Sequence, residues 1–198
     1  NVSCYPVLRN NPQTAWPIQY NMNGGLLPEY AIYGYLTGSP QSLPLATRAG
    51  YQFGGWYQDS ALQIGPVAAT PDQGATAMNL YAKWIPNKYN VKFYGNGATS
   101  GTMTALSMSY STAKPLTTNA YKKAGYAFLG WAKTSTGAVV YKDKATVNNL
   151  TTSNNGTVNL YAKWGPPIVS ATSNGYTSIK VTWAAAGNAT AYKIYQCY

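Results

Sequence analysis

One heptapeptide pattern occurs twice in this chain and constrains its fold more than any other feature. The sequence Gly-Tyr-x-Phe-x-Gly-Trp occupies residues 50–56 and again residues 125–131. A second pattern, Asn-Leu-Tyr-Ala-Lys-Trp, follows at residues 79–84 and 159–164. The first spacing is 75 residues and the second is 80, so the second copy has five extra residues between its patterns. Because both patterns recur in the same order, the chain contains two copies of one folding unit.

The repeated patterns divide the chain into five segments. We assign residues 1–15 to an N-terminal segment, 16–84 to a first unit, 85–87 to a linker, 88–164 to a second unit and 166–198 to a C-terminal segment. Each unit has the length of a small domain. The linker is short and contains a proline, so we expect only limited bending between the units.

Within each unit, apolar and polar side chains alternate as they do in strands. In the second unit Tyr89, Val91 and Phe93 are separated by residues of the opposite face, which is the two-residue period of a strand. The Asn-Gly pairs at 23–24 and 96–97 supply the positive-φ turn that follows such a strand. The predicted fold is therefore mainly β, or a small α+β fold at most.

The closing pattern also alternates, because Leu80, Ala82 and Trp84 share one face of the predicted strand. Segments 32–46 and 103–113 lie between the motif strands. We expect a further strand and a short helix there, and nearby prolines limit any helix to a turn or two.

These motifs resemble the Listeria–Bacteroides repeat, also called the internalin B-repeat. That family has an opening strand ending in Asn-Gly-Gly, then Gly-Tyr-x-Phe-x-Gly-Trp and a closing Leu-Tyr-Ala-Lys-Trp. The resemblance covers about three quarters of the chain. It implies two tandem β-grasp-like domains, of a kind found on secreted and wall-attached bacterial proteins, often adhesins, with no known catalytic constellation. Two departures, Asn-Gly-Ala at 96–98 and a Tyr-rich segment at 30–35, leave the expected fold unchanged.

Residues 166–198 resemble the opening of a fibronectin type III domain. A proline-led strand is followed by a strand ending in Trp183 and by a Tyr-x-Ile-Tyr strand beginning at Tyr192. The resemblance implies a three-stranded immunoglobulin- or fibronectin-like β segment, about a third of such a domain. Three strands alone expose an apolar face and open edges. Either the chain is a fragment of a longer protein, or these strands dock on the repeats, or a neighbouring subunit completes the sheet.

The two cysteines, Cys4 and Cys197, lie near opposite ends of the chain. A cysteine pair in an extracellular chain is compatible with a disulfide. In the chain-entropy model, so long a loop would contribute on the order of 4–5 kcal/mol. Two unpaired thiols and bonds to other chains are the alternatives, and the spacing does not decide between them.

The composition argues against catalysis. The chain has no histidine, and its carboxylates are Glu29, Asp59, Asp72 and Asp143. General acid–base catalysis usually needs an imidazole or a tuned carboxylate, and a Ser or Thr nucleophile would lack its His partner. A metal site would lack both His and a carboxylate cluster. We therefore expect no enzymatic activity, no cofactor and no metal site.

The positive charge belongs to the second half of the chain. The net charge is +10, with −1 in residues 1–82 and +11 in residues 83–198. The lysines are mostly scattered, which favours a role in keeping strands soluble over nucleic-acid binding. Attraction to an anionic surface or polysaccharide is the second interpretation. No apolar run is long enough to span a bilayer, so we expect no membrane insertion.

The repeated aromatic and glycine residues are predicted to be structural. Aromatic side chains fill a small core efficiently, and glycine suits turns with special φ. These structural residues are Gly50, Tyr51, Phe53, Trp56, Tyr81, Trp84, Gly125, Tyr126, Phe128, Trp131, Tyr161, Trp164, Trp183 and Tyr192. Ligand contacts are expected elsewhere, with cross-strand aromatic ladders as the alternative role of the tyrosines. The ligand-contact candidates are Tyr30, Tyr33, Tyr35, Lys122 and Lys123.

Three functions are compatible with these features. The first is a non-catalytic, adhesin-type bacterial stalk that presents small β-domains to a host or cell-surface protein or polysaccharide. The second is a subunit of an extracellular filament or surface layer, joined through its termini by strand exchange or disulfides. The third is an ancillary module that binds carbohydrate. All three are extracellular or at the cell surface, where chains with 9% charged and 14% aromatic residues are common.

Overall fold

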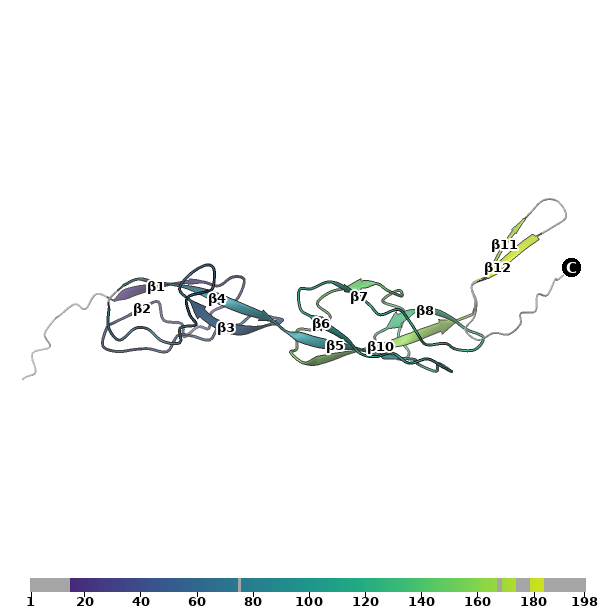
Figure 1. Cartoon of the computed structure of the whole chain (residues 1–198), viewed down its shortest axis with the longest axis horizontal. Helices are drawn as coiled ribbons and strands as arrows, with labels where there is room; N and C mark the ends of the chain where they lie inside the picture. The colour runs from purple at the N-terminus through teal and green to yellow at the C-terminus, as the bar shows by residue number, and fades with distance from the viewer. Residues whose placement is uncertain (1–14, 75, 167–168, 174–178, 184–198) are drawn as a thin grey trace, which may run out of the picture. The chain divides into compact units, whose positions relative to one another are not determined.

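The computed structural model describes residues 15–74, 76–166, 169–173 and 179–183 (Figure 1). The chain divides between Ile85 and Pro86 into two compact units, which are described separately below. The described residues form strands, turns and extended segments without a helix. The mainly β prediction is therefore confirmed, and the expectation of a short helix is wrong.

The first unit has a four-stranded mixed sheet. It consists of β1 (Trp16–Asn21), β2 (Gly34–Tyr35), β3 (Tyr51–Tyr57) and β4 (Met78–Pro86), in the spatial order β2-β1-β4-β3. The opening strand β1 runs parallel to the closing strand β4, and β2 pairs with β1 in the antiparallel direction. The central pair therefore joins the two ends of the unit.

The second unit repeats this arrangement. Its main strands are β5 (Lys88–Tyr94), β6 (Leu106–Ser109), β8 (Ala127–Ala132) and β10 (Gly156–Gly165), in the order β6-β5-β10-β8. Again the opening strand β5 is parallel to the closing strand β10, while β6 and β8 are antiparallel to their neighbours.

Two short strands, β7 (Lys114–Pro115) and β9 (Thr146–Val147), form a separate antiparallel pair in the second unit. The expected extra strands are β2 and β6, each inside one of the segments where a strand and a helix were predicted. Those segments continue as turns and extended chain where a helix was expected. Pro40 and Pro44 interrupt the first segment, and proline removes a helix hydrogen bond and clashes with the preceding turn. Residues 103–113 contain no proline, and there Leu106–Ser109 form β6 instead.

Each unit has its own hydrophobic core. Trp56 and Trp131, the tryptophans of the heptapeptide, are 1% and 0% exposed. Leu80 and Leu160, from the closing strands, are both 0% exposed. Burying an apolar side chain of this size contributes about 1.5–3 kcal/mol. The first core comprises Ile18, Tyr35, Leu43, Ala46, Trp56, Met78, Leu80 and Ala82. The second comprises Tyr89, Val91, Phe93, Met108, Leu116, Trp131, Val147, Leu160 and Ala162.

The other repeated aromatic residues surround these cores. Phe53 and Trp84 pack against the first core, and Phe128 and Trp164 pack against the second. Tyr51, Tyr81 and Tyr161 are half-buried, whereas Tyr126 is 43% exposed. Thus these aromatic side chains form a layer around each core, in which Tyr126 is the most exposed ring.

The same hydrogen bonds connect the opening turn to the closing strand in both units. Asn23 Nδ2 donates to the Ala82 carbonyl at 2.8 Å, and Asn96 Nδ2 donates to Ala162 at 2.9 Å. Both asparagines have positive φ, 46° and 47°, which asparagine tolerates better than most residues. The Asn-Gly turn is therefore part of the frame that closes each sheet.

The closing tryptophans also bind the residue that precedes this turn. Trp84 Nε1 donates to the Met22 carbonyl at 2.8 Å, and Trp164 Nε1 donates to Gly95 at 2.9 Å. A half-buried indole usually needs such a partner for its N–H group. The final tryptophan of each repeat thus combines apolar packing with one hydrogen bond.

After the second unit, β11 (Val169–Ser173) and β12 (Ile179–Trp183) form an antiparallel hairpin. The third predicted strand, with Tyr192, lies outside the described residues, as do Cys4 and Cys197. Nothing among the described residues is a helix long and apolar enough to cross a membrane.

Candidate functional site

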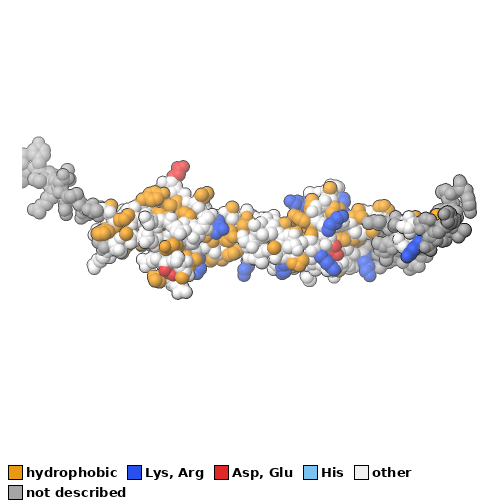
Figure 2. Space-filling view, turned by 90° about the horizontal axis from the view of Figure 1, so that it is seen from above, with side chains coloured by type: hydrophobic (Ala, Val, Ile, Leu, Met, Phe, Trp, Pro, Cys, Tyr) orange, Lys and Arg blue, Asp and Glu red, His pale blue; other side chains and the backbone are white. Residues whose placement is uncertain are grey.

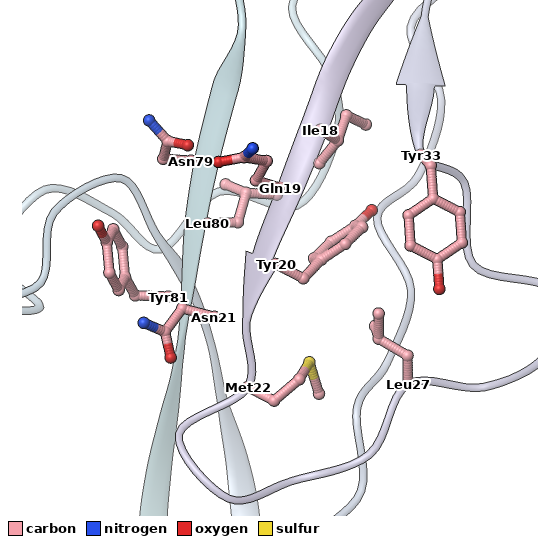
Figure 3. Close-up of a pocket in the computed structure, with 10 residues that line it drawn as sticks. All are labelled: Ile18, Gln19, Tyr20, Asn21, Met22, Leu27, Tyr33, Asn79, Leu80 and Tyr81. Carbon is pink, nitrogen blue, oxygen red and sulfur yellow. The ribbon is translucent and has the colours of Figure 1, made fainter.

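A groove of about 710 Å³ lies along the opening strand of the first unit. Its lining comes from β1 and the residue after it (residues 18–22), from β4 (residues 79–81), and from Leu27 and Tyr33 in the segment that leads to β2 (Figure 3). None of these lining side chains is charged. Because successive side chains of a strand point to opposite faces, the amides Gln19, Asn21 and Asn79 lie on the face of the sheet opposite to Ile18, Tyr20 and Leu80.

Tyr20 forms a fixed part of the groove. Its hydroxyl donates to the Ile32 carbonyl at 2.9 Å, and its ring centroid lies 4.9 Å from that of Trp56. Burial raises the pKa of Tyr20 to about 12, and the neighbouring Tyr33 adds a smaller electrostatic effect in the same direction. Tyr20 is therefore neutral at physiological pH, and its position is fixed both by the hydrogen bond of its hydroxyl group and by the packing of its ring.

Tyr33 lies beside Tyr20 but is open to solvent. Its ring meets that of Tyr20 edge to face, with centroids 6.0 Å apart and an interplanar angle of 86°. Figure 3 shows the Tyr20 side chain directed from β1 toward Tyr33. Tyr33 is 66% exposed and the nearby Tyr30 is 72% exposed. These two ligand-contact candidates are accessible, and Tyr33 lines the groove.

The third tyrosine candidate, Tyr35, is in the core. It is 1% exposed, and its hydroxyl donates to the Thr76 carbonyl at 2.7 Å. Its assignment as a ligand contact is wrong for this folded structure. The reason is local. The chain bends at Tyr33, and Tyr35, in β2, then pairs with Trp16 of β1, which directs the Tyr35 side chain inward.

The lysine candidates belong to the second unit. Lys122 is exposed, and its backbone pairs with Ser100. Lys123 is half-buried, with its Nζ atom 4.5 Å from the Tyr126 ring centroid. Arg48 makes the corresponding cation–π contact with Tyr51 in the first unit, at 4.1 Å. Lys123 therefore has a structural counterpart in the other repeat, and Lys122 is the freer cation of the pair.

Sequence reasoning missed the amide side chains of the groove, Gln19, Asn21 and Asn79. All three are exposed and lie on adjacent strands, since Gln19 pairs with Asn79 across β1 and β4. The available signal was their alternation with the buried Ile18 and the half-buried Tyr20. It was not distinctive, because uncharged polar residues occur throughout this chain.

The corresponding face of the second unit is different. In the same register, β5 and β10 pair Lys92 with Asn159 and Tyr94 with Tyr161. The two tyrosine rings stack, with centroids 5.0 Å apart and an interplanar angle of 15°. A lysine and a stacked aromatic pair thus stand where the first unit has Gln19, Asn21 and Tyr81.

Two of the four carboxylates have local structural partners. Asp59 accepts hydrogen bonds from the backbone amides of Gln63 and Ile64. Asp143 accepts from the backbone amides of Asn119 and Lys144. Within the described part of the chain, no three His, Cys, Asp or Glu residues come together as metal ligands could.

The fold and this surface define an all-β tandem-repeat protein. The sequence profile of the Listeria-Bacteroides repeat domain matches residues 16–83 and 89–163. These two matches cover most of the chain, which therefore belongs to the Listeria–Bacteroides repeat family. They end before the C-terminal segment, so its resemblance to fibronectin type III stays a prediction.

Two relatives come from Evansella cellulosilytica. One, named "Putative Gly-rich membrane protein", is 29% identical over 169 residues, which are 83% of this chain and 18% of that protein. The other, named "Putative membrane protein", is 27% identical over 166 residues, which are 83% of this chain and 23% of that protein. The chain thus spans about a fifth of the length of these relatives. No solved structure matches it.

Proposed function

We propose that this chain is a non-catalytic part of a bacterial secreted or cell-surface protein, in which tandem β-units carry an exposed binding surface. The observation that carries this proposal is that the hydrogen bonds closing each sheet recur in both units, whereas the exposed residues of the same strands differ. The hydrogen bonds of Asn23 and Trp84 recur in the second unit with Asn96 and Trp164. The exposed positions of the same strands differ.

Contact rather than catalysis is supported by the chemistry of the side chains. The chain has no histidine, and Asp59 and Asp143 already accept hydrogen bonds from backbone amides. The groove is lined by uncharged groups. Such groups bind by hydrogen bonding and apolar contact, which requires no proton transfer.

A surface location is supported by the family and by the names of the two relatives, both of which contain "membrane protein". The second unit adds a positive field: Figure 2 shows Lys and Arg side chains mainly over that part of the molecule. A field of this sign increases the encounter rate with anionic cell surfaces. The filament alternative depends on termini that lie outside the described residues, and no described contact favours it.

Protease treatment of intact cells of the source bacterium tests the location. We expect tryptic peptides from both units to be released while a cytoplasmic marker protein stays intact. Release only after lysis would overturn the proposal. An independent test incubates the labelled chain with intact cells and isolated walls, using heat-unfolded chain as the control. Equal retention of folded and unfolded chain would show that no folded binding surface is involved.

A further inference from the structure

We propose that the outer face of the second unit's sheet binds a carboxylated polysaccharide, with lysines contacting its uronate groups and a tyrosine pair contacting a sugar ring. This inference rests on the proposed function and names the ligand class of one binding surface. The residues of this surface, called the Lys–Tyr face below, are Lys88, Lys92, Tyr94, Asn159, Tyr161 and Lys163.

All six side chains lie on one side of the sheet. The three members from β5 are exposed and alternate with residues of the core. The three members from β10 alternate with Leu160 and Ala162, which are both 0% exposed. Because successive side chains of a strand point to opposite faces, the core side chains point one way and the Lys–Tyr face points the other. A single extended ligand can therefore contact the whole set.

The lysines are evenly spaced along this face. Lys88 and Lys92 are four residues apart in β5, and Lys163 lies four residues beyond Asn159, the partner of Lys92 in β10. Four residues of a strand rise about 13 Å, so each lysine stands about that far from the next along the strand direction. A linear polymer with charges at regular intervals matches such a row.

The sign of the charge selects an anionic ligand. Residues 86–166 contain nine lysines and a single carboxylate, Asp143. Asp143 accepts hydrogen bonds from the backbone amides of Asn119 and Lys144, which lie outside β5 and β10. Neither of these two strands contains a carboxylate. A carboxylate of the ligand would thus supply the opposite charge, in hydrogen bonds that are stronger than those between neutral groups.

The tyrosine pair adds a requirement for a sugar ring. The rings of Tyr94 and Tyr161 stack with centroids 5.0 Å apart, and Tyr94 is 37% exposed. Stacking fixes both rings before a ligand arrives, which lowers the entropy lost on binding. The face of an aromatic ring is electron-rich, so the C–H groups on one face of a pyranose pack well against it. The register places the pair between Lys92 and Lys163 along the strands, so one sugar chain can reach the rings and both cations.

The fold does not require this combination of residues. In the first unit Gln19 and Asn21 occupy the positions of the second lysine and the tyrosine of β5, and the same parallel strand pair forms. Residues 15–85 also hold three carboxylates against two cations. We therefore expect the polysaccharide to leave the first unit unoccupied.

The lysine that both units share is held differently in each. Lys83 of the first unit donates from Nζ to the Tyr57 hydroxyl at 3.2 Å and lies 4.7 Å from the centroid of that ring. In the second unit Ala132 follows the heptapeptide in place of Tyr57, and Lys163 Nζ donates to the Thr136 carbonyl at 3.3 Å. That contact uses one of the three N–H donors of an ammonium group, so the other two can reach a ligand.

Titration of the full chain at low salt tests the inference. The carboxylated probes are hexagalacturonate and a hyaluronan hexasaccharide, maltohexaose is the neutral comparison, and linear polyphosphate is an anion without a sugar ring. We expect at least one carboxylated probe to bind at micromolar to millimolar concentration in calorimetry, and more weakly as salt is added. Maltohexaose should not bind in that range. Amide chemical shifts should change along β5 and β10 and stay constant in β1 and β4.

Variants that install the residues of the first unit locate the site. Lys92→Gln combined with Tyr94→Asn should weaken binding of the carboxylated probe about tenfold or more. Tyr94→Asn alone should weaken that probe about threefold or more and leave polyphosphate binding unchanged. Lys122→Gln is the matched control, because it removes the same charge from an exposed lysine outside β5 and β10. It should change binding less than about twofold. Native amide spectra are recorded first for each variant.

Several outcomes would overturn the inference. One is that neither carboxylated probe binds at millimolar concentration, and another is that maltohexaose binds as tightly. A third is that Lys122→Gln weakens binding as much as the double variant, or that Tyr94→Asn has no effect, which would leave only diffuse attraction between charges. A fourth is that phosphatidylglycerol vesicles bind in preference to both uronates, which would assign the face to membranes. Each result is compatible with release of the peptides from intact cells, so the surface proposal fails or survives separately.

Discussion

The two units of this protein have the same frame and different surfaces. In both, the opening strand lies parallel to the closing strand, and an Asn-Gly turn is hydrogen-bonded to the closing strand. On the outer face, Gln19 and Asn21 of the first unit correspond to Lys92 and Tyr94 of the second. The repeat therefore restricts the residues that close the sheet and leaves exposed positions free to acquire binding properties.

The frames also differ in one buried hydrogen bond. Trp56 Nε1 donates to the Pro44 carbonyl at 2.8 Å, whereas the equivalent Nε1 of Trp131 has no partner among the described residues. A buried donor without a partner costs about 1–3 kcal/mol. The shared sequence motif thus reproduces the position of the ring but not all of its contacts.

The largest expected effect tests whether the frames are equivalent. Leu80→Ala and Leu160→Ala each remove a side chain that is 0% exposed. Each should destabilise its own unit by about 3–5 kcal/mol, with the two values within about 1 kcal/mol of each other. Amide hydrogen exchange in the full chain measures both units at once. Destabilisations that differ by clearly more than about 1 kcal/mol would show that the two cores are not energetically equivalent.

The next effect concerns the glycine before the core tryptophan. Gly130 has φ +141°, and a Cβ atom there would lie 2.5 Å from the Tyr141 carbonyl oxygen. Gly130→Ala should destabilise the second unit by about 2–4 kcal/mol, from strain and steric overlap together. Gly125→Ala is the control, because its φ is also positive but no atom lies within 4 Å of the added carbon. It should cost about 1 kcal/mol, and equal costs in urea denaturation would contradict the steric argument.

The tryptophan pair tests the difference between the frames. Trp56→Phe leaves the Pro44 carbonyl without its donor, whereas Trp131→Phe removes a donor that has no partner in the part of the chain that the structure describes. Both changes lose similar apolar volume. Trp56→Phe should therefore be more destabilising by about 1 kcal/mol. Hydrogen exchange of each unit supplies the comparison, and a greater loss for Trp131→Phe would show that its indole N–H is satisfied in solution.

The smallest effect is a dependence on alkaline pH in the first unit. The pKa of Tyr20 is raised from 10.0 to about 12 because burial disfavours the phenolate. The neutral phenol therefore stabilises the fold fully below pH 10, and this contribution decreases as the pH rises toward 12. Chemical denaturation at several alkaline pH values measures it, with Tyr20→Phe as the control. An unchanged pH dependence in Tyr20→Phe would assign the effect to another group.

Much of the fold could be predicted from local sequence. The strand patterns, the Asn-Gly turns and the two units follow from side-chain alternation and repetition. The positive φ of Gly50 and Gly125, 82° and 76°, agrees with the turns expected there. The expectation of short helices was wrong, because neither segment shows a 3.6-residue apolar period, and Leu106–Ser109 pair with β5 as a strand.

Much less of the candidate site could be predicted. Tyr30, Tyr33 and Tyr35 look alike in the sequence, yet only Tyr35 is buried. The amides that line the groove come from β1 and β4, whose parallel pairing brings together residues about sixty positions apart, Gln19 and Asn79. No local sequence pattern indicates that these two distant residues are neighbours in the sheet.

The sequence by itself determined that this protein is a tandem of two small β-units and that acid–base groups are scarce. Both conclusions depend on residue identity and spacing, which the chain carries before it folds. Tertiary structure decided which tyrosines are accessible and which amides share a groove. These properties depend on strand pairing and on a bend at Tyr33, because pairing between distant segments sets which side of a sheet each residue faces.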